Sequence, residues 1–241
     1  MLKRRVMIGL MFDDGVLTRT KCFRPDYRYT QQFLAVDAID EAILVDITRG
    51  GPSEASKNAI EAFASRCFAP ITVGGHVSSI SDVGVYFTRG ADKIVIGRAA
   101  LENPGFITEI AMKWGSQAVV VACDVLNGEV VNGRTGEKTG KTPIEWCLEA
   151  QERGAGEIYL QSVERDGSLG GYELDALRGI SGTVGIPVIV GTGCGSWRHM
   201  QAAFEAGADG AVTHCVHHWT ETALMGFKRS LLEAGVEVRA A

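Results

Sequence analysis

The sequence contains no apolar run approaching the roughly 18 residues that are needed to span a bilayer. Its N-terminus lacks the apolar region and the small-residue cleavage site of a secretory signal peptide. Lysine and arginine form no block, and the formal net charge is -5, which disfavours a general surface for nucleic acid or anionic membrane. We therefore expect a cytoplasmic protein whose partners are neither nucleic acids nor membranes, and in which any anion site is local.

Cysteine pairs of the CxxC type are also missing. The six cysteines are scattered along the chain, which argues against a disulfide framework and against a structural zinc site. The run THCVHHW, residues 213–219, groups three histidines with a cysteine, but no matching ligands occur at a suitable spacing elsewhere. A short polar helix after a strand explains this run as well, and we expect neither a metal nor a cofactor.

What the sequence does contain is a regular alternation of short apolar runs and longer amphipathic stretches. Strands with apolar residues on both faces, separated by helices, are typical of a parallel sheet. The predicted strands lie at residues 5–12, 41–47, 70–75, 92–97, 117–124, 157–162, 186–191 and 210–214. Eight such units in 241 residues fit an α/β fold of the closed (β/α)8 TIM barrel type, formed by one domain over residues 1–241.

An internal repeat supports the barrel. Residues 71–97 (ITVGGHVSSISDVGVYFTRGADKIVIG) parallel residues 188–214 (VIVGTGCGSWRHMQAAFEAGADGAVTH): each has a strand, a glycine-containing turn, a helix and a second strand. The chain is therefore expected to consist of two similar half-barrels. In such a barrel the residues that follow the strands converge on one catalytic face.

Glycine-rich turns on that face are candidate anion sites. GTGCG at Gly191–Gly195 and GRAA at Gly97–Ala100 can present backbone N–H groups and a helix N-terminus to a phosphate. A third turn, ERDGSLGG, adds Asp166 and Gly167. Tight turn chemistry alone would also explain these glycines.

Asp124 closes the fifth predicted strand and is the candidate general acid or base, with a capping role as the alternative. The segment NGEVVNGRTGEKTG that follows predicts a small hairpin, which could be a flap over the catalytic face or a plain solvated loop.

Longer segments identify a family. The runs RGADKIVIGRAALENPGFITEIAMKWGSQAVVVACD, GAGEIYLQSVERDGSLGGYE and AFEAGADGAV resemble the cyclase subunit of imidazole glycerol phosphate synthase, HisF, and the similarity spans essentially the whole chain. The resemblance implies a (β/α)8 barrel that works with a glutaminase subunit. It also implies that ammonia enters from the N-terminal face of the strands and that a bisphosphorylated substrate binds on the opposite face.

The resemblance also implies roles for charged residues at the N-terminal face. Four residues fall on the positions of the family's ammonia gate: Arg5, Glu41, Lys93 and Glu157. Two cations and two anions at the starts of alternate strands can neutralise one another across a narrow opening. Asp92 and Gln117 match positions near the surface that faces the glutaminase.

The catalytic face matches the family less completely. Family cyclases use two aspartates, and Asp124 falls on the second, whereas Met11, which cannot transfer a proton, occupies the position of the first. Asp13 and Asp14 follow closely and could compensate.

The phosphate sites of the family can be carried over in part. In the second half the expected ligands are Asp166, Gly167, Gly191, Gly193, His214 and Cys215, where Cys215 replaces a serine-type ligand. In the first half His76 replaces a glycine, and Gly97 with Arg98 replaces an Asn-Thr pair. The first-half site is thus expected to bind a different anion, or none.

The stretch LTRTKCFRPDYRYTQ is similar to a branch of HisF-like proteins that accompanies sugar amidotransferases in bacterial surface-polysaccharide clusters. The leading hypothesis is therefore a barrel that accepts ammonia from a HisH-like glutaminase for acetamidino formation on a sugar. Its expected partners are that glutaminase, a sugar amidotransferase, and a phosphorylated or nucleotide-linked small molecule. Three alternatives remain: a histidine-pathway cyclase, a sugar-phosphate isomerase of the related half-barrel family, and a non-catalytic conduit that tethers the glutaminase.

Overall fold

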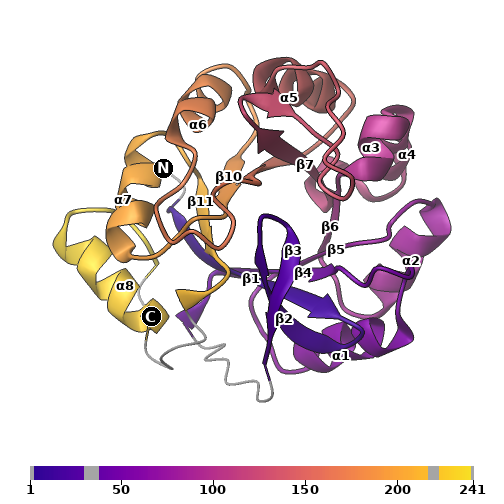
Figure 1. Ribbon diagram of the computed structural model, residues 1–241, viewed down its shortest axis with the longest axis horizontal. Coiled ribbons are helices and arrows are strands. Elements are labelled where there is room, and N and C mark those ends of the chain that lie inside the picture. The colour runs from indigo at the N-terminus through magenta and orange to yellow at the C-terminus, as the bar shows by residue number, and fades with distance from the viewer. Residues whose placement is uncertain (1–2, 30–37, 217–222, 240–241) are drawn as a thin grey trace.

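The computed structural model describes residues 3–29, 38–216 and 223–239, and it shows a closed barrel of eight parallel strands surrounded by helices (Figure 1). Each barrel strand pairs with its neighbour in parallel, and β11 pairs with β1 from Arg5↔Gly210 to Ile8↔Thr213, which closes the sheet. The barrel strands are β1 (Arg5–Asp13), β4 (Glu41–Asp46), β5 (Ile71–Gly74), β6 (Lys93–Ile96), β7 (Val119–Leu126), β9 (Glu157–Ser162), β10 (Val188–Gly191) and β11 (Gly210–Thr213). All eight predicted strands and the predicted (β/α)8 fold are confirmed.

Helices follow the strands, as the amphipathic stretches predict, and cover the outside of the barrel (Figure 1). They are α1 (Glu54–Ala64), α2 (Ile80–Thr88), α3 (Arg98–Glu102), α4 (Gly105–Trp114), α5 (Pro143–Glu152), α6 (Leu174–Ser181), α7 (Trp197–Glu205) and α8 (Ala223–Glu233), with a short 3-10 turn at Ser116–Ala118. No helix in the described ranges has the length and hydropathy to cross a membrane.

The two halves repeat in their backbone and in their contacts. Asp92 accepts a hydrogen bond from the Ile71 N–H at 2.8 Å, and Asp209 accepts one from the Val188 N–H at 3.0 Å, so each Gly-Ala-Asp motif ties its strand to the preceding strand in the same way. After β5, Gly75 and His76 both have positive φ (89° and 57°), and after β10 Thr192 and Gly193 do so as well (67° and 92°). The first-half turn thus keeps the backbone of its counterpart even though His76 stands where the second half has glycine.

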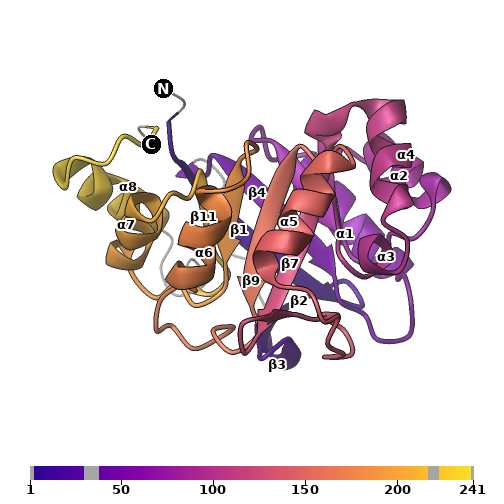
Figure 2. The same ribbon diagram turned by 90° about the horizontal axis from the view of Figure 1, so that it is seen from above.

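Two hairpins extend the sheet on the carboxyl-terminal face. β2 (Val16–Lys21) and β3 (Arg24–Arg28) form an antiparallel pair that continues from β1, and β8 (Glu129–Val130) folds back on β7. The second hairpin confirms the prediction from the Asn127–Gly128 turn, where both residues have positive φ. In Figure 2 both hairpins lie at the end of the barrel opposite the chain termini.

The barrel interior is a separate apolar layer. The inward-facing apolar side chains are Met7, Ile43, Val95, Val120, Ala122, Tyr159, Ile189 and Val212. Alternate residues on the same strands face outward and pack under the helices, as Val6, Ile8 and Leu10 do on β1. Because Arg5 and Met7 face inward, the pleat of β1 also turns Gly9 and Met11 toward the barrel axis.

Gly9 is required by this interior packing. A Cβ atom at Gly9 would lie 2.2 Å from Cδ2 and 2.3 Å from Nε2 of His214. We expect Gly9→Ala to lower the free energy of unfolding by about 1–3 kcal/mol, measured by urea denaturation, because the added methyl group must displace a buried ring. Gly84→Ala is the matched control: nothing lies within 4 Å of its Cβ position in α2, and alanine there should stabilise the helix. Equal stability of the two variants would contradict this account of Gly9.

Candidate active site

Asp124 lies near the end of β7 and is partly buried among neighbouring elements. Its Oδ1 accepts a hydrogen bond from Nε2 of Gln161 on β9 at 3.0 Å. Above it, a Cβ atom at Gly133 would lie 2.2 Å from Asp124 Oδ2, so the β8 hairpin passes directly over the carboxylate. Burial raises the pKa of Asp124 to about 7, against the opposing effect of the Gln161 hydrogen bond. A carboxyl group with this pKa is half ionised at neutral pH and can act as a general acid or a general base.

The β2–β3 hairpin completes the cover over Asp124. The same Gly133 Cβ position is 3.2 Å from the Phe23 ring, so the tips of the two hairpins meet beside the carboxylate. Asp166 holds the first hairpin there, because its Oδ2 accepts the Phe23 N–H at 2.9 Å and its backbone oxygen accepts the Cys22 N–H at 3.3 Å. Asp166 thereby has a structural partner as well as its predicted place in the second-half site.

The carboxylates that follow Met11 also have structural partners. Met11 pairs with Thr18 of β2 and lies at the inner side of the barrel mouth. Asp13 forms an ion pair with Arg28 at 2.5 Å. Asp14 accepts a hydrogen bond from Ser53 Oγ at 2.7 Å, at the N-terminus of α1. Neither contact brings an aspartate of this segment to Asp124.

The second-half turn offers backbone groups to an anion. Gly193 has φ 92°, and a Cβ atom there would lie 2.1 Å from the Gly171 oxygen, so only glycine fits. Helix α7, which follows this turn, has no side chain that caps its N-terminus, and neither has α3 after Gly97, whereas α1, α2 and α5 are capped. The uncapped N–H groups of α7 and α3 could donate hydrogen bonds to a phosphate. Helices α4 and α6 lack such caps as well, so a missing cap does not by itself mark a phosphate site.

Cys215 and His214, two of the predicted phosphate ligands of the second half, are buried. Cys215 is 4% exposed, and burial raises the pKa of its thiol to about 11, so it is protonated at neutral pH. His214 is 9% exposed, and its Nε2 lies 2.9 Å from the Tyr159 hydroxyl. Gly191 is equally interior, because a Cβ atom there would lie 2.6 Å from the same hydroxyl.

The first-half residues are arranged differently. His76 Nε2 lies 2.8 Å from the Thr48 oxygen, and Arg134 reaches from the β8 hairpin to within 3.5 Å of His76 Nδ1. Arg98 forms an ion pair with Glu102 of its own helix, at 3.2 Å, while Gly97 is the N-cap residue of that helix. The structure thus joins His76 to the hairpin over the mouth and gives Arg98 a local ion-pair partner.

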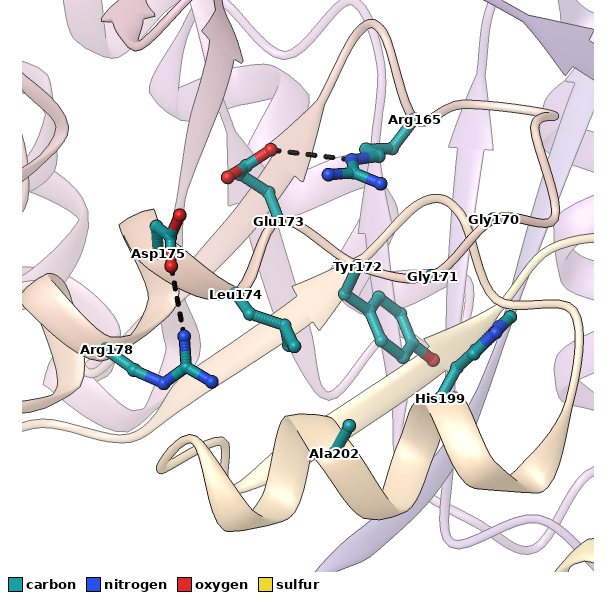
Figure 3. A pocket seen from close by; sticks show the side chains of 10 residues that line it. All are labelled: Arg165, Gly170, Gly171, Tyr172, Glu173, Leu174, Asp175, Arg178, His199 and Ala202. Carbon is teal, nitrogen blue, oxygen red and sulfur yellow. Dashed lines mark hydrogen bonds and ion pairs between the residues drawn. The ribbon is translucent and has the colours of Figure 1, made fainter.

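A cavity of about 330 Å³ lies beside the second-half turn, between α6 and α7 (Figure 3). Its basic groups are paired: Arg178 with Asp175 at 3.0 Å and Arg165 with Glu173 at 3.5 Å. His199 accepts the Gly195 N–H at 3.0 Å through Nδ1. Because its charges are already paired, this cavity presents no surplus positive charge to a phosphate.

At the other end of the barrel, four charged side chains form a closed ring. Arg5 Nη1 lies 2.7 Å from Glu41 and 2.9 Å from Glu157, and Lys93 Nζ lies 3.0 Å and 3.1 Å from the same two carboxylates. Burial by itself lowers the pKa of Arg5, but Glu157 and Glu41 outweigh it and raise the pKa above the ordinary value. The structure therefore brings the four gate candidates together.

The two candidate docking residues have local contacts near this end. Asp92 accepts the Ile71 N–H described above, and Gln117 donates to the Trp114 oxygen at 3.2 Å, where α4 ends. Both residues are exposed. Among the described residues no group of three or more histidine, cysteine or acidic side chains could hold a metal ion, and His217 and His218 lie outside the described residues.

The fold and its two ends define a class: a (β/α)8 barrel of repeated halves with a carboxyl group at the mouth and a charged ring at the base. A family model described as histidine biosynthesis protein matches residues 14–221. The chain is 36% identical over 249 positions to imidazole glycerol phosphate synthase subunit HisF of Thermotoga sp. strain RQ2, covering 99% of this chain and 98% of the relative. The chain belongs to this histidine biosynthesis family.

Two further relatives bear the same name. HisF of Chlorobium phaeobacteroides is 38% identical over 243 positions, with 98% of this chain and 94% of the relative covered. HisF of Pyrobaculum aerophilum is 38% identical over 210 positions, with 84% and 82% covered. The predicted resemblance to HisF is thus confirmed.

The raised pKa of Asp124 predicts a pH dependence of stability. Because the folded chain holds this proton up to about pH 7 and the unfolded chain releases it near the ordinary value of 3.8, stability contributed by the proton is lost as pH rises between these values. We expect Asp124→Asn to remove this loss, so that the variant gains stability relative to the original chain from pH 4 to 7. Urea unfolding across this range measures it, with the exposed Asp175→Asn as the control that should follow the original chain. Parallel curves for Asp124→Asn and the original chain would contradict the assignment.

Proposed function

We propose that this chain is the synthase subunit of a two-component glutamine amidotransferase, which accepts ammonia from a HisH-like glutaminase and uses it to form an acetamidino group on a surface-polysaccharide sugar. One observation carries the proposal: a complete four-charge ring closes the base of the barrel, while the mouth has Asp124 but Met11 in place of a second carboxylate. The base suits the entry of ammonia, and the mouth lacks the acid–base pair of the family's cyclisation.

The N-terminal face supports docking of a partner. Phe68, in the connection before β5, is fully exposed, and Met112 in the last turn of α4 is 84% exposed. Both segments end on the face at which the strands begin, which also carries the charged ring and the predicted docking residues Asp92 and Gln117. These two side chains place exposed apolar area on that face, which is the kind of surface that a partner subunit can cover.

At the mouth, Asp124 is the group that handles protons. Ammonia attacks an electrophilic carbon of the acceptor through its lone pair, the leaving group on that carbon departs with its bonding electron pair, and the nitrogen loses a proton, which the Asp124 carboxylate can accept at neutral pH. A phosphorylated or nucleotide-linked sugar would place its phosphate on the second-half turn at Gly193, and a sugar amidotransferase would be the second partner. The two hairpins over Asp124 would exclude water during the reaction.

The discriminating test is turnover of the bisphosphorylated substrate of the histidine pathway with ammonium chloride as nitrogen donor. We expect no appreciable cyclisation, since Asp13 is paired with Arg28 and Asp14 with Ser53. Robust turnover that Asp124→Asn abolishes would overturn the sugar-amidation proposal and establish the cyclase alternative.

The conduit alternative is separated by a second comparison. If the barrel only tethers and activates the glutaminase, Asp124→Asn leaves the output of amidated product unchanged, because the ring and the docking face remain intact. A loss of amidated product with normal glutaminase activity supports a catalytic role for the mouth.

A further inference from the structure

Tyr159 and His214 form a polar pair inside the apolar barrel, between the charged ring and the mouth. The Tyr159 hydroxyl lies 2.9 Å from His214 Nε2, and the two residues are 1% and 9% exposed. Tyr159 belongs to the interior cluster with Met7, Ile43 and Val95, which offer no hydrogen bonds. Among the described residues, the pair therefore adds polar groups next to this apolar cluster.

The backbone around the pair makes room for it. A side chain at Gly9 would collide with the His214 ring, and one at Gly191 would collide with the Tyr159 hydroxyl and ring. Neither glycine has a positive φ, so the reason for glycine at both positions is space for the two rings. Strands β1 and β10 thus both leave, at a glycine, the space that one ring of the pair occupies.

The pair is also the middle step of a polar series along β9. Inward-facing residues on this strand are Glu157 in the ring, Tyr159 in the interior and Gln161 at the mouth, where it donates to Asp124. Glu157 Oε2 is buried and has no hydrogen-bond partner among the described residues. Alternate residues of a strand lie about 6.6 Å apart. A small molecule that forms a hydrogen bond of about 2.9 Å to a group on each side bridges a similar distance.

Ammonia that crosses this interior needs such groups. An ammonia molecule carries N–H donors and a lone pair, and transferring it from water into apolar surroundings without hydrogen bonds is unfavourable. We propose that the Tyr159–His214 pair is an ammonia-binding site midway through the barrel, an inference that rests on the proposed passage of ammonia from the ring to the mouth. The pair marks where the molecule pauses between Glu157 and Gln161.

The site works in either tautomer of His214. If the hydroxyl donates to Nε2, its oxygen lone pairs can accept an ammonia N–H, and if Nε2–H donates, the hydroxyl proton is available to the ammonia lone pair. Burial raises the pKa of Tyr159 well above its ordinary value, so the hydroxyl stays protonated. In either case the hydrogen bond between Tyr159 and His214 is kept while ammonia binds, and no covalent bond changes.

NMR of the uncomplexed chain tests the site directly. The protein is labelled with 15N in its histidine rings, and ammonium chloride is added at mildly alkaline pH against equal concentrations of sodium chloride. We expect a saturable change in the chemical shifts of the His214 ring nitrogens, whose signals are assigned by their loss in His214→Gln. The signals of His199 should show only the shift that both salts cause. Tyr159→Phe should weaken the response about three- to tenfold through loss of one hydrogen-bonding group, and Tyr86→Phe, which removes a hydroxyl between α2 and the barrel, should leave it unchanged.

The outcomes separate the two proposals. If ammonium chloride shifts the His214 signals no more than sodium chloride does, the proposed site is overturned, and no variant is needed to reach that conclusion. An equal response in Tyr159→Phe and in the original chain also overturns it, because the hydroxyl then plays no part. This measurement uses no glutaminase and no acceptor, so its failure leaves the amidotransferase proposal standing. That proposal fails instead if 15N from the glutamine amide never reaches a product.

Discussion

Replacing Asp124 with asparagine is expected to reduce the transfer of ammonia nitrogen to the acceptor by about 100-fold or more, the usual contribution of a general acid or base. Asparagine keeps the size of the side chain, but it can neither release nor accept the proton that Asp124 exchanges near pH 7. The measurement follows 15N from ammonium chloride into small molecules by mass spectrometry, in an extract of cells that lack this chain and to which the purified variant is added. The extract supplies acceptor and partner proteins whose identity need not be known.

The matched control is Asp13→Asn. Asp13 is paired with Arg28 of the β2–β3 hairpin, so we expect a rate close to that of the original chain. The original chain should also show a change of rate with a midpoint near pH 7, rising if Asp124 acts as a base and falling if it acts as an acid, and Asp124→Asn should lack this limb. A rate that falls with Asp13→Asn but persists with Asp124→Asn would show that Asp13, and not Asp124, carries the proton transfer.

The barrel could be predicted from the sequence because its signals are local and repeated. Each strand is a short apolar run buried on both faces, and the two Gly-Ala-Asp motifs mark equivalent positions in the halves, where Asp92 and Asp209 make the same contact. The ring of charges was found through resemblance. Its members lie as far as 152 residues apart, and only closure of the barrel brings Arg5 to Glu157.

The β2–β3 part of the cover over Asp124 could not be predicted in the same way. Strand β3 is exposed along its length, so it has no apolar alternation, and the turn between β2 and β3 uses Cys22 and Phe23 at positive φ where glycine or asparagine would have signalled a hairpin. The Tyr159–His214 pair was missed because its residues are 55 positions apart. One signal was present: Glu157, Tyr159 and Gln161 alternate along a predicted strand, which places three polar groups on its inner side.

Within the charged ring, Glu41 is the residue whose loss should be most damaging to the fold. It is 2% exposed, contacts both Arg5 and Lys93, and accepts a further hydrogen bond from Thr72 at 2.9 Å. Glu41→Gln keeps the shape of the side chain but leaves two partly buried cations facing the single carboxylate of Glu157. We expect the free energy of unfolding to fall by about 3 kcal/mol or more, since breaking a buried ion pair on one side leaves an uncompensated charge.

Urea unfolding of a small set of variants tests this charge balance. Thr72→Val, which removes the hydrogen bond without changing the charge, should cost about 1 kcal/mol. Adding Lys93→Met to Glu41→Gln restores one cation facing one anion, so the double variant should recover part of the loss, a coupling that independent sites would not show. If Glu41→Gln is no less stable than Thr72→Val, the ring is not held together by charge. Its closure at the base of the barrel would then rest on packing alone.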